Sequence, residues 1–154
     1  MSAGQTGPNG RRRAAAFATR WGPALLLMMV IFIASAIPGE EFPQYKGGWD
    51  YIIKKSGHLL EYGILTLLML RGLAGPGLAG ATRRQKLGAL GLTMLYAATD
   101  EFHQRFTPGR RGQVPDVLID LIGGGLALGA YYAWGLIRQT RSQAPRSQST
   151  RPPA

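Results

Sequence analysis

An uncharged apolar run from Trp21 to Ile37, WGPALLLMMVIFIASAI, constrains this 154-residue chain more than any other feature. A helix rises about 1.5 Å per residue, so the run nearly crosses a hydrocarbon core, which needs about 20 residues. Three further apolar runs follow, at about 58–73, 87–102 and 117–137. Isolated strands would leave backbone groups unpaired in lipid, so helices are expected. The sequence therefore predicts an all-α fold, an integral membrane bundle of four helices.

Two other interpretations of the apolar runs have to be weighed. Basic residues precede the first run as in a secretory signal peptide, and Ala34-Ser35-Ala36 resembles a cleavage site. Three more spans follow, however, and the run is long for a signal peptide, which favours a retained span. A soluble bundle is disfavoured because the runs at 21–37 and 117–137 have no solvated polar face.

The polar ends of the chain differ from its middle. Residues 1–20 and 138–154 are rich in Gly, Pro, Ser, Gln and Arg and poor in large apolar residues. They cannot bury enough surface to offset chain entropy, so they are predicted to be disordered basic tails. One transmembrane domain, residues 21–137, would lie between them. The chain has no Cys, which excludes disulfides, thiolate zinc sites and Cys nucleophiles.

The distribution of Lys and Arg predicts an orientation. The formal net charge of +10 comes mainly from the tails and from short connections such as Arg83-Arg84-x-Lys86. No nucleic-acid recognition motif accompanies this charge, so nucleic acid is not an expected partner. The positive side of a membrane protein is cytoplasmic, which places both termini in the cytoplasm of a multi-pass protein of the cell membrane. The connections at about 38–57 and 103–115 would then face outward.

Polar residues gather at the predicted outer ends of the second, third and fourth spans. All eight acidic residues lie between Glu40 and Asp120, on the outer side. Lys55, His58 and Tyr62 share one helical face by their spacing. The candidate ligand-binding residues are Lys55, His58, Tyr62, Asp100, Glu101, Gln104, Arg110, Asp116 and Asp120. Ionisable residues inside a span indicate function by default, because they are costly there.

The connection between the third and fourth spans carries a turn signal and a proline. Thr107-Pro108-Gly109-Arg110 is typical of a tight turn, which would return the chain to the membrane and aim Arg110 at the helix ends. Pro115 suits the first turn of the fourth span. The run Gly123-Gly124-Gly125 would permit close backbone approach, and Gly125-x-x-x-Gly129 is a weak helix-packing motif.

These blocks together resemble the VanZ-like membrane protein family, named for a glycopeptide (teicoplanin) resistance factor. The resemblance covers about residues 20–137. It is carried by Lys55-x-x-His58-x-x-x-Tyr62, Asp100-Glu101-x-x-Gln104, Pro108-Gly109-Arg110 and Asp116-x-x-x-Asp120-x-x-Gly123. It implies a cell-envelope protein with a context in antibiotic resistance. The chain departs from the family at Asp120, where Asn is usual, and a carboxylate there would change the charge of the site or pair with Arg110.

The first functional hypothesis is an envelope protein that recognises an anionic ligand. The partners would be the lipid bilayer and a phosphorylated or lipid-linked cell-wall precursor, or a glycopeptide. Lys55, His58 and Arg110 would supply positive charge, and the four nearby carboxylates would orient them or accept hydrogen bonds from the ligand. Such contacts are stronger in low dielectric than in water.

Two other hypotheses stay open. A membrane-embedded hydrolase or transferase would use His58 as a general base, oriented by Glu101 or Asp116, so His58 and Glu101 are the candidate catalytic residues. No cofactor is otherwise expected, although a divalent metal on His58, Glu61, Asp100 and Asp116 is an alternative. In a structural or assembly subunit, which could oligomerise, the buried charges would only hold the helices together.

Overall fold

The computed structural model describes residues 8–41, 48–75, 77–110 and 112–142. Its elements are α1 (Pro8–Ser35), η1 (Gly39–Glu41), α2 (Trp49–Ala74), η2 (Leu78–Gly80), α3 (Arg83–Gln104) and α4 (Val114–Ser142). The predicted all-α class and the four helices are confirmed. The second, third and fourth predicted spans each lie inside a helix, and the first ends two residues beyond α1.

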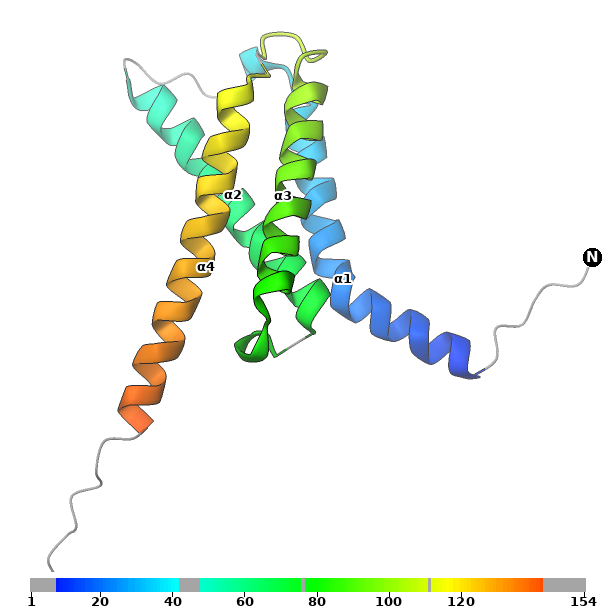
Figure 1. The fold of residues 1–154 in the computed structure, drawn as a ribbon. Helices are drawn as coiled ribbons and strands as arrows, with labels where there is room; N and C mark the ends of the chain where they lie inside the picture. Colours follow the sequence, from blue (N-terminus) through cyan, green and yellow to red (C-terminus); the bar gives the residue numbers. More distant parts are fainter. Residues whose placement is uncertain (1–7, 42–47, 76, 111, 143–154) are drawn as a thin grey trace, which may run out of the picture.

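The helix ends correct the predicted tails. Residues 8–20 and 138–142, predicted to be disordered, belong to α1 and α4. Arg and Ala, which fill the segment Arg11–Ala16, are strong helix formers, and a helix that has already nucleated in an apolar span extends at low cost. The rest of both predicted tails lies outside the described residues. Pro23 lies inside α1 and removes one backbone hydrogen bond, and Figure 1 shows α1 bending near this point.

The four helices run alternately up and down, with α2 packed against α4, α3 and α1 (Figure 1). The core is therefore centred on α2, where Tyr62, Leu65 and Leu70 are fully buried. At the lower end of the bundle, polar contacts stabilise the helix ends. The guanidinium of Arg20 donates to the carbonyls of Gly72 and Leu73, and Thr82 caps α3 together with Gln85 in a capping box.

Glycines set how closely α2 and α4 approach. A Cβ on Gly123 would lie 2.3 Å from the carbonyl oxygen of Leu59, and one on Gly124 would lie 2.4 Å from Oγ1 of Thr66. The predicted close approach is thus confirmed at these two positions. It is wrong at Gly125, which, like Gly129, has no described atom near its Cβ position. The Cβ positions of both face away from the neighbouring helices, because the side of α4 that faces α2 is the one that carries Gly123 and Gly124.

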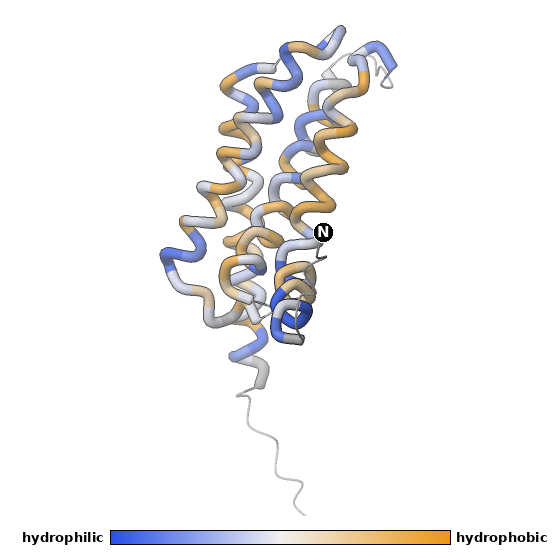
Figure 2. The backbone as a smooth tube through the Cα atoms, turned by 90° about the vertical axis from the view of Figure 1, so that its right-hand side faces the viewer, coloured by the Kyte–Doolittle hydropathy of each residue, from blue (hydrophilic) through white to orange (hydrophobic). Residues whose placement is uncertain are grey.

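The outer surface of the bundle is apolar. Large side chains of α1 such as Leu26, Met29 and Ile33 are more than half exposed. Figure 2 shows hydrophobic residues over the middle of the helices and hydrophilic ones toward the ends. Two helical segments in the described part of the chain, Asn9–Ser35 and Val114–Thr140, are long and apolar enough to cross a membrane. Few residues of α1 are buried, unlike in the core helix of a soluble protein, and an apolar surface of this kind is typical of contact with lipid.

Candidate functional site

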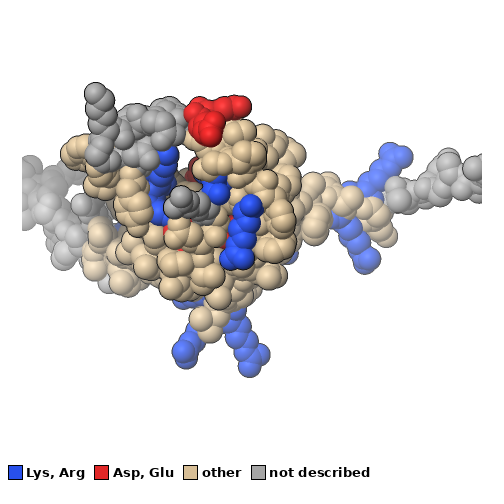
Figure 3. All heavy atoms as spheres, turned by 90° about the horizontal axis from the view of Figure 1, so that it is seen from above, with Lys and Arg blue, Asp and Glu red and all other residues tan. Residues whose placement is uncertain are grey.

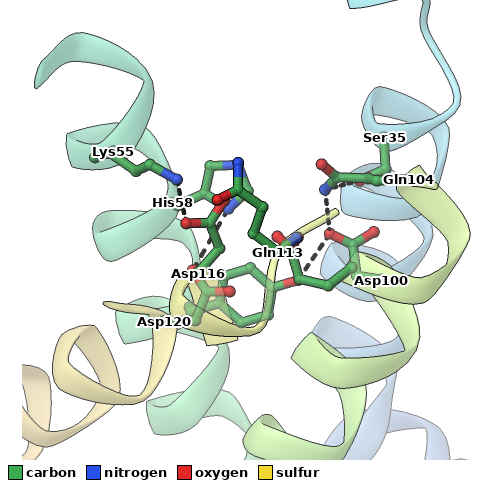
Figure 4. Close-up of polar contacts among 10 residues, drawn as sticks. Ser35, Lys55, His58, Asp100, Gln104, Gln113, Asp116 and Asp120 are labelled. Atoms are coloured by element: carbon green, nitrogen blue, oxygen red, sulfur yellow. Dashed lines mark hydrogen bonds and ion pairs between the residues drawn. The ribbon is translucent and has the colours of Figure 1, made fainter. Parts of the chain in front are cut away.

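The polar residues predicted to form a site lie at one end of the bundle, where α1 ends, α2 and α4 begin and α3 turns into α4 (Figure 1). Figure 3 looks down on this end and shows Lys and Arg side chains at the surface around it, with acidic side chains at one edge. Beneath that surface Asp100, Glu101, Gln104 and Asp120 are buried. The polar contacts of this end are drawn in Figure 4. We call the residues that make them the polar centre: Ser35, Lys55, His58, Tyr62, Asp100, Glu101, Gln104, Gln113, Asp116 and Asp120.

One half of the polar centre joins α2 to α4. Lys55 forms an ion pair with Asp116, and Nδ1 of His58 lies 3.4 Å from Oδ1 of Asp120 (Figure 4). Lys55 and His58 are three residues apart, and Asp116 and Asp120 are four apart, so each pair stands on one helical face. The predicted opposition of these faces is confirmed by the two contacts. Asp120 lies against His58 and is completely buried.

The other half joins α2 to α3 and α1. The hydroxyl of Tyr62 donates to Oδ2 of Asp100 at 3.0 Å, and Nε2 of Gln104 donates to the same oxygen at 2.9 Å (Figure 4). The Gln104 amide also donates to Oγ of Ser35 at 3.3 Å. Asp100 therefore joins α3 to α2 as a shared acceptor, and Gln104 extends the network to α1. Ser35 was not predicted, because an isolated Ser at the end of an apolar run carries no signal of this contact.

Glu101 faces the start of α4. Its Oε2 accepts a hydrogen bond of 2.8 Å from the backbone N–H of Gln113, the residue before the first helical residue Val114. A carboxylate at a helix start satisfies an unpaired N–H and complements the macrodipole. Pro115 lies in the first turn of α4, as predicted. Gln113 contributes through its backbone, so side-chain patterns could not reveal it.

The turn between α3 and α4 closes against the end of α1. The predicted tight turn is confirmed: the N–H of Arg110 donates to the carbonyl of Thr107, and Gly109 has a φ of +70°. The guanidinium of Arg110 donates to the carbonyls of Ala34 and Ile37 at 3.2 and 3.4 Å. Arg110 thus points at a helix end, as predicted, and that end is the carboxyl end of α1, where a cation is favoured.

The contacts revise the assignment of the group that orients His58. Glu101 or Asp116 was the predicted carboxylate, but Asp120 is the one 3.4 Å from the imidazole. Asp116 is instead engaged by Lys55. Asp116 lies about one turn before Asp120 on α4, so it meets α2 about one turn away from His58, at Lys55.

The predicted metal ligands are also revised. Glu61 is exposed, because α2 turns His58 and Tyr62 inward and leaves Glu61 on its outer surface. Among the described residues, the group with metal-ligand spacing is His58, Glu101 and Asp120, whose ligand atoms lie within 4.8 Å of one another. Two of the four residues predicted for this role lie elsewhere in the polar centre: Asp100 accepts from Tyr62, and Asp116 pairs with Lys55.

The hydrogen bond between Tyr62 and Asp100 leads to a prediction. Tyr62→Phe should lower the free energy of unfolding by about 1–3 kcal/mol, because the buried Asp100 loses one of its two donors to Oδ2. Thermal unfolding of the purified protein in detergent measures this. Tyr51→Phe is the matched control, since Tyr51 is on the same helix and 63% exposed. Equal stability of the two variants would contradict the role assigned to Tyr62.

Comparison with known proteins identifies a family. A family model described as VanZ/LLP1 matches residues 20–137, which include α2, α3 and most of α1 and α4. All residues of the polar centre fall inside the match. No curated protein and no solved structure matches the chain.

Proposed function

The chain belongs to the VanZ/LLP1 family, and we propose that it is a multi-pass membrane protein of the bacterial cell envelope that recognises an anionic, lipid-linked ligand. All four helices would cross the bilayer, with both termini in the cytoplasm and the polar centre at the outer face. The two apolar helices and the exposed apolar surface support insertion. The excess of Lys and Arg at the opposite end supports the orientation.

The orientation can be tested directly, because the chain has no Cys of its own. Single Cys residues at Gln113 and at Arg83, both exposed, would lie on opposite sides of the bilayer. A membrane-impermeant maleimide should label Gln113→Cys in intact cells and should label Arg83→Cys only after permeabilisation. The reverse pattern would show that the polar centre faces the cytoplasm, and labelling of both in intact cells would contradict a four-span topology.

A groove of about 480 Å³ between α2 and α4 supports a lipid-linked ligand. Apolar residues line it, including Leu59, Ile64, Leu126 and Trp134. Ligand sites are commonly apolar clefts with a few polar groups at one end. This groove has the dimensions and chemistry for part of a hydrocarbon chain.

The observation that carries the proposal is that this groove begins next to the polar centre along both α2 and α4. Leu59 lines the groove and directly follows His58. Gly123 lines it from the other side and lies one helical turn after Asp120. An apolar tail in the groove would therefore bring an attached head group close to the polar centre. A molecule with an apolar chain and a charged phosphate head fits this arrangement better than a free anion.

Binding by the purified protein in nanodiscs tests the proposal. A polyprenyl diphosphate should bind, whereas polyprenol, which lacks the charge, and inorganic diphosphate, which lacks the tail, should bind weakly. Ala127→Trp should weaken binding by about tenfold or more, because it fills the groove and displaces methylene groups whose burial contributes about 0.8 kcal/mol each. Leu136→Trp is the control, since Leu136 is exposed on the same helix away from the groove.

Two results would overturn the proposed ligand class. Binding of inorganic diphosphate as tight as that of polyprenyl diphosphate would show that the groove contributes nothing. Binding of a glycopeptide such as teicoplanin, without binding of polyprenyl diphosphate, would replace the lipid-linked ligand with a soluble one. An equal loss of affinity in Ala127→Trp and Leu136→Trp would also remove the groove from the site.

A further inference from the structure

We propose that His58, Glu101 and Asp120 bind one divalent metal ion in the polar centre. The three come from α2, α3 and α4, so an ion there would join three helices (Figure 4 draws His58 and Asp120). One ligand atom from each residue lies within 4.8 Å of the other two. Ligand atoms on opposite sides of an ion are up to about 4–5 Å apart at bond lengths of about 2.0–2.5 Å, so small movements would close the site.

Unpaired buried oxygens point to a cation independently of this spacing. Asp120 is 0% exposed and Glu101 is 3% exposed. In the described part of the chain, Oδ2 of Asp120 and Oε1 of Glu101 have no hydrogen-bond partner, and Oδ1 of Asp120 has only its 3.4 Å contact with Nδ1 of His58. A buried polar atom left without a hydrogen bond costs about 1–3 kcal/mol, so such oxygens in a native protein call for a partner. A metal ion would satisfy them together.

Charge leads to the same conclusion. His58 offers at most one positive charge to the buried carboxylates of Glu101 and Asp120, through the 3.4 Å contact of its Nδ1 with Asp120. Lys55 is engaged by Asp116, and the guanidinium of Arg110 donates to carbonyls of α1. A divalent ion coordinated by a neutral His58 would balance two carboxylates.

The donor set indicates the class of ion. One imidazole and two carboxylates suit Mn²⁺, Fe²⁺ or Zn²⁺ better than Mg²⁺ or Ca²⁺, which prefer oxygen ligands alone. Three protein ligands leave coordination positions open. If the proposed function holds, a phosphate oxygen of the ligand would occupy one of them, and the ion would supply the positive charge that an anion needs in this acidic centre. Only this last step rests on the proposed function.

Metal binding to the full-length protein in detergent, without any ligand, tests the site. Titration with Mn²⁺ or Zn²⁺ should show one ion per chain. Asp120→Asn and Glu101→Gln keep the size of the side chain but remove a charged ligand. Each should weaken metal binding by at least about tenfold, because even the loss of a residue that only hydrogen-bonds to a metal ligand typically costs about 10–100-fold in affinity. Glu61→Gln is the matched control: it makes the same chemical change at an exposed position one turn from His58 on α2, and it should bind as the wild type does.

A second measurement avoids the acidic variants, which would fail as evidence if they did not fold. The chain has two His residues, and His103 stacks on Phe32 outside the proposed site. Pulsed electron paramagnetic resonance of the Mn²⁺-loaded wild type should show a coupling to an imidazole nitrogen. This coupling should persist in His103→Gln and disappear in His58→Gln. No bound ion in the wild type, no nitrogen coupling, or its loss only in His103→Gln would each overturn the proposal.

The two proposals fail separately. Binding of one ion without binding of polyprenyl diphosphate would retain the metal site and reject the ligand. Binding of polyprenyl diphosphate to protein that binds no ion would reject the metal site and retain the ligand. If both hold, Mn²⁺ should raise the affinity for polyprenyl diphosphate in the wild type, and the increase should be absent in Asp120→Asn.

Discussion

Gly123→Ala is expected to lower the free energy of unfolding by about 1–3 kcal/mol or to prevent folding altogether. A Cβ at this position would lie 2.3 Å from the carbonyl oxygen of Leu59 and 3.0 Å from its carbonyl carbon and Cα. All three neighbours belong to the backbone of α2, so no side chain can turn aside to make room. The added methyl group would push α4 away from α2 and separate His58 from Asp120. Thermal unfolding and the yield of monodisperse protein in detergent measure the effect.

Gly125→Ala is the matched control for this prediction. Gly125 is two residues further along the same helix, and no described atom lies within 4 Å of its Cβ position. Ala is a better helix former than Gly by about 0.8–1.0 kcal/mol, so this variant should be as stable as the wild type or more so. Equal destabilisation of both variants would mean that Gly123 acts through helix flexibility and that close packing against α2 is not its role.

Arg110→Ala is expected to cost about 1.5–3 kcal/mol of stability, the range for hydrogen bonds to charged groups. Its guanidinium donates to the carbonyls of Ala34 and Ile37 and favourably places a cation at the carboxyl end of α1. The same turn is held by the N–H of Gly39, which donates to the carbonyl of Pro108 at 2.9 Å. Removing the guanidinium should therefore loosen α1 from the turn between α3 and α4. Thermal unfolding in detergent gives the size of the loss.

Arg105→Ala is the control for Arg110→Ala, because Arg105 is exposed at the end of α3 and its removal should change stability little. The comparison also separates two hypotheses for Arg110. As a ligand-binding residue, Arg110 would lose binding on substitution with stability nearly unchanged. If Arg110→Ala lowers stability but the folded protein still binds the ligand with unchanged affinity, then Arg110 serves to hold the helices together. The contacts with α1 favour assembly for Arg110, and the buried carboxylate oxygens without a hydrogen bond favour function for Glu101 and Asp120.

Much of the candidate site follows from the sequence, because its members stand at helical spacing on three separate helices. Spacing alone predicts that Lys55 and His58 share a face, and that Asp116 and Asp120 share another. The tight turn at 107–110 follows from Pro108 and Gly109. The residues that carry the family resemblance are also those that the fold brings together. The spacing could not show which acid meets which base, because that depends on how far α4 slides along α2.

The sequence by itself determined the four helices, their alternating directions and the end of the bundle where polar groups meet. The length of the apolar runs, the turn residues and the segregation of charge can each be read from the sequence, because none of them depends on how the helices pack. Local patterns failed at the helix ends, where residues 8–20 extend α1 because elongation of an existing helix is cheap.

Only the tertiary structure decided the partners within the polar centre. Contact of Gly123 with the backbone of Leu59 sets the distance and register between α2 and α4. That register places Asp120 beside His58 and Asp116 beside Lys55. Contacts between helices depend on three-dimensional packing, and a shift of about one helical turn would exchange the partners. The buried group of His58, Glu101 and Asp120 is a product of that packing.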